Sequence, residues 1–254
     1  MAVLCGVGLF LLMLVSSEIG RRIGLARLVR HGDGLAKVGG TAEAATFALF
    51  GLLVAFTFSG AASRFQDRRD LVSVEANSIG TAYLRVDLLP RDARPQMREL
   101  FLRYLDVRFE VYRHAEDTTM TKGLLAETNT LQTEIWNLTL SSAQRSDAAP
   151  QATQLLLPAL NEMIDITATR AMATQNHPPL VVFILLGGLS LICALLVGYD
   201  TSKNSARSWL HTLCFAAIVS LTVYVIVDLE FPRLGLIRVD AADQALLDLR
   251  ESIQ

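Results

Sequence analysis

The stretch FTFSGAASRFQDRRDLVSVEANSIG, residues 56–80, decides the fold because it changes from apolar to charged without a residue that would end a helix. Its first half is apolar enough for lipid, and its second half carries many acids and bases. No proline occurs between Thr41 and Leu89, so nothing in this range forces a helix to end. A helix over the whole range would be roughly 70 Å long, about twice the thickness of the bilayer core. We therefore expect a membrane span that continues beyond the membrane as one helix.

The apolar residues of this helix keep one angular position on both sides of the expected membrane boundary. With Phe50 at 0° and 100° per residue, they form a stripe between about 0° and 80°. The stripe consists of Phe47, Phe50, Val54 and Phe58 inside the span, and of Phe65, Val72, Ala76, Ile79, Tyr83 and Val86 beyond it. We expect the helix to continue because the same face is buried in both places.

Hydrophobic residues make up 52% of the 254-residue chain, and they gather in four stretches that qualify as membrane spans. The spans are expected at 2–17, 42–63, 180–199 and 210–227. The first has no positive region before it and a poor cleavage site, so we expect a retained helix and not a signal peptide. Between spans 2 and 3 the chain is too charged to cross lipid, and apolar spacings of three and four predict helices at 95–117, 120–145 and 151–175.

The sequence thus predicts an all-α membrane protein with four transmembrane helices and a helical extramembrane domain inserted between spans 2 and 3. Residues 1–63 hold spans 1 and 2 with a basic loop at 18–41, and residues 64–178 form the helical domain. Residues 179–229 hold spans 3 and 4, and residues 230–254 form a C-terminal tail. Basic residues flank the spans almost equally on both sides, so orientation stays open, with the short loops favouring a domain outside the cytoplasm.

Two spans carry lines of small residues, which let membrane helices approach closely. Span 2 has Ala44, Ala48, Gly51, Ala55, Ser59 and Ala62, and span 3 has Gly187, Ser190, Ala194 and Gly198. Each line fits helix packing within one subunit or packing between subunits, and the sequence alone leaves both alternatives open.

Three stretches resemble a known family. They are SEIGRRIG at 17–24, FGLLVAFTFSGAASRFQDRRDLVSVEANSIGTAYLRVDLLP at 50–90 and DLEFPRLGLIRV at 228–239. They are similar to the bacterial DUF4239 family of membrane proteins, whose domain is also labelled bestrophin-like, and the resemblance covers essentially the whole chain. Bestrophins are pentameric, mainly anion-selective channels with four transmembrane helices per subunit. Their large domain and both termini lie in the cytoplasm, whereas the charge count here leans slightly the other way.

The resemblance implies that span 2 lines a pore through a hydrophobic neck and then continues into a helical domain. Phe50, Val54 and Phe58 are spaced by four residues and fit such a neck, because a ring of apolar side chains can gate by dewetting. In a pentamer, Arg64 and Arg68 would form rings of positive charge that attract anions. The alternative for these arginines is anchoring at the end of the span, with Asp67 and Asp70 as ion-pair partners.

Three acidic residues are further candidates, each with a structural alternative. Glu75 lies beside the arginine line and is either a gating carboxylate or the ion-pair partner of an arginine on a neighbouring helix. Asp228 and Glu230 end span 4, where an acid at membrane depth is costly and often functional. At a span end they can instead reach the interface and pair with Arg233 or Arg238.

We find no metal-ligand spacing among the four histidines, no nucleophile or phosphate-binding motif, and no cofactor signature, so we expect no enzymatic activity. The net charge of −2 gives no indication of nucleic-acid binding. The sequence favours a homo-oligomer, pentameric if it follows the resemblance, that lets small ions, anions above cations, permeate the bacterial inner membrane. The alternative is a non-conducting scaffold or sensor whose helical domain binds a partner or ligand.

Overall fold

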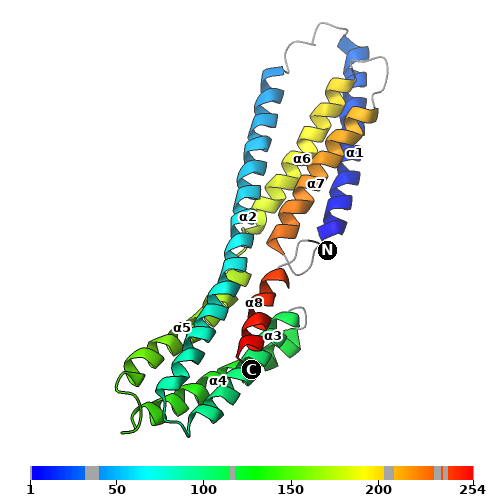
Figure 1. Ribbon diagram of the computed structural model, residues 1–254. Helices are drawn as coiled ribbons and strands as arrows, with labels where there is room; N and C mark the ends of the chain where they lie inside the picture. The colour runs from blue at the N-terminus through cyan, green and yellow to red at the C-terminus, as the bar shows by residue number, and fades with distance from the viewer. Residues whose placement is uncertain are drawn as a thin grey trace. The chain divides into compact units, whose positions relative to one another are not determined.

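The structure, a computed structural model, describes residues 2–31, 40–114, 118–202, 209–231, 236 and 240–253. All regular elements within these residues are helical (Figure 1). Four stretches of helix are long and apolar enough to cross a membrane, and they contain α1 (Ala2–His31), α2 (Gly40–Leu84), α6 (Leu180–Thr201) and α7 (Trp209–Glu230). The prediction of an all-α protein with four membrane spans is confirmed.

The chain forms two compact units. Unit 1 contains Met1–Phe65 and His177–Ile237, and unit 2 contains Gln66–Asn176 and Arg238–Gln254. The 45-residue helix α2 contributes its first part to unit 1 and its last part to unit 2, so the long helix expected through residues 56–80 is present. It passes into a short 3-10 helix, η2 (Arg85–Leu88), two residues before Pro90.

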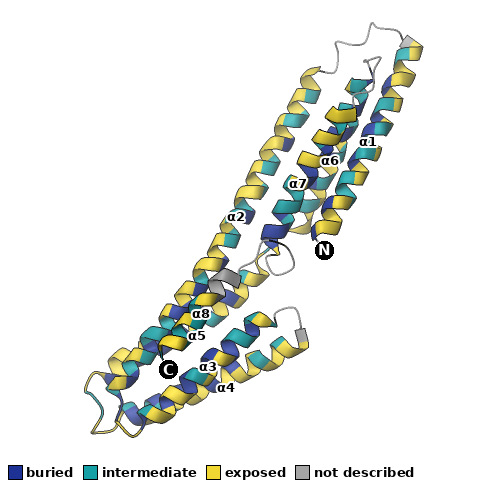
Figure 2. Ribbon diagram, turned by 45° about the vertical axis from the view of Figure 1, so that its right-hand side comes forward, coloured by how far each residue is buried: buried dark blue, intermediate teal, exposed yellow. Residues whose placement is uncertain are grey.

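Unit 1 packs α1 against α6 and α7, with side chains of α2 completing the core. The buried cluster consists of Met13, Phe50, Ala61, Leu186, Cys193, Ala194, Ala216, Val219, Ile226 and Leu229. The outward faces of the same helices are also apolar: Leu4 is 77% exposed, Leu210 is 70% exposed and Ile218 is 66% exposed (Figure 2). Such a surface is costly in water and suits lipid. Together with the four spans, it makes this a multi-pass membrane protein.

Glycines bring α1 and α6 into backbone contact. A Cβ on Gly198 would lie 1.8 Å from the carbonyl oxygen of Ser17, and one on Gly20 would lie 2.0 Å from that of Leu195. Ser16 Oγ also donates to the carbonyl of Leu191 at 2.7 Å. Three of the four small residues of span 3, Ser190, Ala194 and Gly198, therefore pack within the subunit.

Unit 2 consists of the last part of α2, η2, α3 (Arg94–Arg113), α4 (Thr118–Ala143), α5 (Ala152–Gln175) and α8 (Asp240–Ser252). Pro95 lies in the first turn of α3, where its missing N–H costs no hydrogen bond. The core combines residues of all six elements, among them Ile79, Val86, Phe101, Ile135, Leu160 and Leu246. The apolar stripe expected on the end of α2 faces this core, since Val72, Ile79 and Val86 are fully buried.

The chain after residue 230, expected as a tail, contains helix α8. Leu246 of α8 is buried in the core of unit 2, and Tyr83 donates a hydrogen bond to the carbonyl of Ile253 at 3.0 Å. Arg250 pairs with Asp106 of α3. These contacts attach the end of the chain to α2 and α3.

Candidate functional site

The predicted neck residues lie differently on α2. Phe50 is 7% exposed and Val54 is half-buried, and both pack with the core of unit 1. Phe58 is 43% exposed, so it projects from the helix without filling that core. A neck requires several copies around one axis, so its formation by these residues stays a prediction.

Five of the six small residues in the line on α2 face outward in the single chain, namely Ala44, Ala48, Gly51, Ala55 and Ser59. The sixth, Ala62, is half-buried and packs against the core of unit 1. A Cβ added to Gly51 would meet no heavy atom of another residue within 4 Å. The five exposed residues therefore do not serve packing within the described part of the subunit, in contrast to Ser190, Ala194 and Gly198 of α6.

At the end of the span, Arg64 of α2 binds Glu230 of α7. Arg64 Nε donates to Glu230 Oε1 at 2.9 Å, and Arg64 Nη2 contacts the same oxygen. The other carboxylate oxygen of Glu230 lies 3.4 Å from Nδ1 of His177, whose ring stacks on Phe231 at 4.6 Å. Glu230 is fully buried, and the groups that bind its carboxylate come from two other segments, α2 and the residues before α6.

Asp228, also fully buried, accepts the backbone N–H of Leu236 at 3.0 and 3.2 Å through its two oxygens. The partners expected for the two acids, Arg233 and Arg238, lie outside the described residues. The structure shows Arg64 and His177 bound to Glu230.

Arg68 is 7% exposed and caps the end of α5. Its guanidinium donates to the carbonyl of Ala173 at 3.1 Å and to that of Asn176 at 2.9 Å. The last carbonyls of a helix have no partner within the helix, and a cation there also interacts favourably with the helix dipole. A role of Arg68 toward ions stays a prediction, as it does for Arg64.

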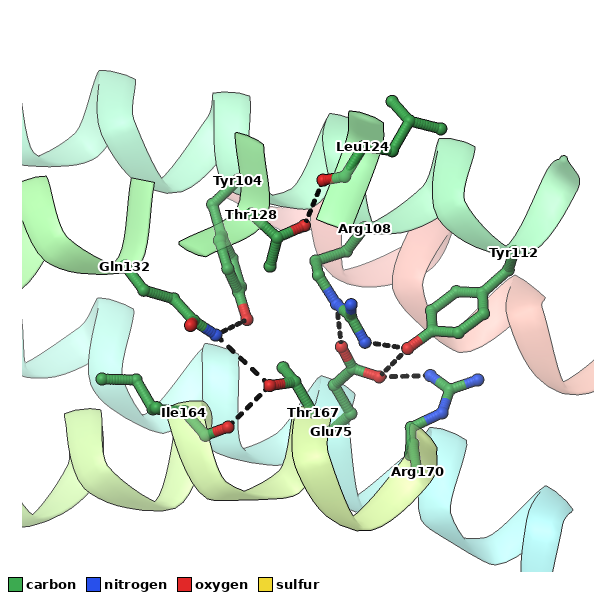
Figure 3. Close-up of polar contacts among 10 residues, drawn as sticks. All are labelled: Glu75, Tyr104, Arg108, Tyr112, Leu124, Thr128, Gln132, Ile164, Thr167 and Arg170. Carbon is green, nitrogen blue, oxygen red and sulfur yellow. Dashed lines mark hydrogen bonds and ion pairs between the residues drawn. The ribbon is translucent and has the colours of Figure 1, made fainter. Parts of the chain in front are cut away.

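Glu75 is the centre of a buried ionic cluster in unit 2 (Figure 3). Arg108 Nε of α3 donates to Glu75 Oε1 at 2.6 Å, and Arg170 of α5 pairs with Oε2. The hydroxyl of Tyr112 donates to Oε2 at 2.8 Å, and the Arg170 guanidinium lies 3.7 Å from the centre of the Tyr112 ring. The cluster thus joins α2, α3 and α5 through one carboxylate, as the ion-pair alternative for Glu75 expected.

A second set of polar groups lies beside this cluster (Figure 3). Gln132 of α4 donates to the hydroxyl of Tyr104 at 3.2 Å and to Thr167 Oγ1 at 3.4 Å. Thr167 in turn donates to the carbonyl of Ile164 at 2.7 Å. The polar groups inside unit 2 therefore connect α3, α4 and α5.

Burial and charge shift the proton equilibria of the residues on α3. Burial raises the pKa of Tyr104 to about 12 and also raises the pKa of Tyr112, where the nearby charge of Glu75 acts in the same direction. Burial alone would lower the pKa of Arg108, but the charge of Glu75, its hydrogen bond to Arg108 and the two nearby tyrosines together outweigh burial and raise that pKa. Both tyrosines are therefore neutral and Arg108 is charged at physiological pH.

Sequence reasoning identified Glu75 and Glu230 but not the partners Arg108, Arg170, Tyr112 and His177. Arg108 and Tyr112 are four residues apart, one helical turn, which is the pattern that puts two side chains on one face. That signal was present, but the apolar residues around it fit a core equally well.

A family model described as Bestrophin-like domain matches residues 8–243 of the chain. No curated protein and no solved structure matches it. The matched range takes in nearly all of the four spans and of unit 2. Because the match extends over most of the sequence, the chain belongs to the bestrophin-like family.

Proposed function

We propose that several copies of this chain assemble around α2 and let small ions, principally anions, pass down their gradient across a bacterial cell membrane. One observation carries the proposal: the span part of α2 has a long exposed face of small residues, although its opposite face is packed. Small residues allow close helix contact in lipid, where packing drives association. Membership of the bestrophin-like family supports the same assignment.

In this proposal the neck lies at the Phe50, Val54 and Phe58 stripe. Phe58 is the member that projects, and Phe50 and Val54 hold α2 against the subunit from behind. A ring of phenylalanine side chains would exclude water when narrow and admit it when wider, so permeation would be limited by wetting of the neck. No energy source is needed for this passive flux.

The charged residues predicted as a vestibule have intramolecular partners. Arg68 binds carbonyls of α5, and Glu75 binds Arg108 and Arg170. We propose that Arg68 and Glu75 fix α2 in place and influence permeation through its position. The preference for anions is carried over from the family resemblance.

The test is flux through the purified protein in liposomes that contain a chloride-sensitive dye. We expect Phe58→Ala to raise chloride flux several-fold and Phe58→Trp to lower it, because the two changes widen and narrow the neck. Ile184→Ala is the matched control, since Ile184 is 64% exposed on α6. Equal flux in wild type, Phe58→Ala and Phe58→Trp would show that the neck is elsewhere.

A second function, a non-conducting scaffold or sensor, is favoured by the compactness of unit 2. This unit has its own hydrophobic core and its own buried ionic cluster, which a partner-binding bundle needs. If wild-type protein of confirmed fold and orientation gives no flux of any small ion, this second function replaces the first.

A further inference from the structure

A cavity of about 270 Å³ lies within unit 1, between α2, α7 and the beginning of α6. Leu53, Gly60 and Arg64 line it from α2, Val182 and Leu186 from α6, and Ile226 from α7. Its volume is close to the lower end of the range for small-molecule sites, about 300–1,000 Å³.

The walls of the cavity are almost entirely apolar. The hydroxyl of Thr57 donates to the carbonyls of Leu53 at 2.8 Å and Val54 at 3.0 Å, so it is already satisfied within α2. Water is held in a cavity when two to four polar groups bind it, and an apolar cavity of this kind stays dry or binds an apolar guest.

Arg64 is the charged residue of the lining. Its Nε and Nη2 bind Glu230, but Nη1 has no hydrogen-bond partner among the residues that the structure describes. Nη1 lies over the wall of the cavity, since a Cβ on Gly60 would be 3.2 Å from it. The Arg64 side chain is 26% exposed, so one N–H donor group at the edge of the cavity is open to an external acceptor.

The order of the spans puts this donor at the membrane surface. The chain leaves the membrane after the expected end of span 2 at residue 63, re-enters with α6 and leaves again at the end of α7. These three span ends therefore lie on the same side, and Arg64, Pro178 and Glu230 are found there. Leu53 lies roughly 16 Å deeper than Arg64 along α2, and Leu186 lies roughly 12 Å deeper than Pro178 along α6.

We propose that the cavity binds part of an acyl chain of a membrane phospholipid, and that the phosphodiester of the same lipid accepts a hydrogen bond from Arg64 Nη1. The acyl chain matches the apolar walls of the cavity inside the membrane. The phosphodiester oxygen matches the Arg64 donor at the membrane surface. Basic residues between membrane helices are known to hold lipid headgroups, and arginine is well suited to phosphate.

The proposed lipid site is separate from the proposed ion pathway. Leu53, Thr57, Gly60 and Arg64 recur at spacings of four, three and four, so they share one face of α2. Phe58, the residue that projects into the proposed neck, lies about 140° around the helix from Leu53. A lipid can therefore occupy the cavity whether or not the protein conducts.

The test uses the full-length purified protein and phosphatidylglycerol with a photoreactive diazirine in its acyl chain. After photolysis, labelled peptides are mapped by mass spectrometry, with unlabelled phosphatidylglycerol or dioleoylglycerol as competitor. We expect labelling at 53–60 and 182–186 to exceed that of other lipid-facing segments. Phosphatidylglycerol should compete roughly tenfold better than dioleoylglycerol, because the diglyceride lacks the phosphodiester.

Two variants test the apolar cavity and the Arg64 contact with the phosphodiester one at a time. Val182→Trp should fill the cavity and lower the labelling several-fold, whereas Val181→Trp on the neighbouring, 65% exposed position should not. Arg64→Lys keeps a positive charge for Glu230 but has a single nitrogen, which cannot lie on Glu230 and over Gly60 at the same time. It should therefore weaken labelling by the phosphatidylglycerol probe and leave labelling by the corresponding diglyceride probe unchanged.

Labelling spread evenly over all lipid-facing helices of the wild type would overturn the proposal, whatever the variants do. Labelling that appears at the cavity only after the oligomer is dissociated would also overturn it, since a second copy of the chain would then be the occupant. Equal labelling of Val182→Trp and Val181→Trp would place the lipid outside the cavity.

Discussion

Glu75 shows how a single residue can hold three helices in unit 2. Its carboxylate is fully buried, and two arginines and a tyrosine hydroxyl bind its two oxygens. Glu75, Arg108 and Arg170 together carry a net charge of +1. Cation–π contacts with the Tyr112 ring help to stabilise both guanidinium groups. Removing the carboxylate takes its counter-charge away from two buried arginines, which is far more costly than losing an exposed ion pair.

We therefore expect Glu75→Gln to destabilise unit 2 by about 3–5 kcal/mol, because glutamine has a similar shape but no charge. The measurement is chemical unfolding of the full chain in detergent, followed by fluorescence of Trp136, which packs against the unit 2 core. A Trp209→Phe background removes the other tryptophan.

The matched control is Asp106→Asn, since Asp106 pairs with Arg250 at an exposed site. It should cost less than about 1 kcal/mol. Similar losses for Glu75→Gln and Asp106→Asn would mean that the cluster contributes no more than a surface pair.

Because Tyr104 is buried, we expect the folded protein to lose stability at high pH. Its pKa is raised by burial from 10.0 to about 12 in the folded chain, so above pH 10 the unfolded chain holds fewer protons than the folded chain. Stability is then fully present below pH 10 and falls as the pH rises toward 12. In Tyr104→Phe this fall should be smaller when unfolding is measured at a series of alkaline pH values. Identical pH profiles for the two proteins would contradict the assignment.

At the scale of single residues, the sequence indicated that Glu75 and Glu230 are important but did not identify the residues that bind them. Glu75 interrupts an apolar face, which is a local signal, and an ion pair with an arginine on another helix was the expected alternative. Its partners are 33 and 95 residues away, and no spacing rule connects α2 with positions on α3 and α5. The same holds for Arg64, which binds Glu230 at a separation of 166 residues and not the nearby Asp67.

At the scale of elements, the contact of α1 with α6 depends on missing side chains. Gly20, Gly24 and Gly198 all lie where a Cβ would come within about 2 Å of an atom of the facing helix. This lets the two backbones touch, and in lipid such packing replaces the hydrophobic effect as the source of helix association. The GRRIG sequence of α1, with glycines four residues apart, is the corresponding sequence pattern.

We expect Gly198→Ala to lower the thermal stability of the detergent-solubilised protein, because the new methyl group would lie 1.8 Å from the carbonyl oxygen of Ser17. Overpacking of this kind typically costs about 1–3 kcal/mol, occasionally more. Gly188→Ala is the control on the same helix, since its Cβ would meet nothing within 4 Å. If both variants unfold at the wild-type temperature, the backbone contact is not present in the membrane protein.

Most elements could be expected from hydrophobic patterning, and the exception has a physical reason. The four spans are long and continuously apolar, and α3, α4 and α5 are long helices with apolar residues at spacings of three and four. Helix α8 has 13 residues and follows a span, and its apolar side chains gain from burial only because Tyr83, Phe101 and their neighbours form the core that receives them. A short amphipathic helix gives little local signal, so its place could not be derived from its own sequence.

At the scale of the whole molecule, the two lines of small residues have different uses. Ser190, Ala194 and Gly198 of α6 are buried within the chain, so they serve the subunit itself. Gly51 and Ala55 of α2 are exposed in the described chain. The sequence left both alternatives open for both lines, because a small residue looks the same in either setting.

The exposed line on α2 therefore predicts an interface between copies of the chain, which the subunit number can test. Gly51→Leu should reduce the oligomer to smaller species in native mass spectrometry in mild detergent, because the larger side chain keeps neighbouring helices apart. The fold of each subunit should be unaffected, since a Cβ at Gly51 meets nothing within 4 Å. Gly188→Leu is matched to it, as a glycine on a different span with the same open surroundings, and should leave the subunit number unchanged. If Gly51→Leu keeps the wild-type subunit number, α2 does not form the interface between copies. The proposal that ions pass between several copies of this helix would then be wrong.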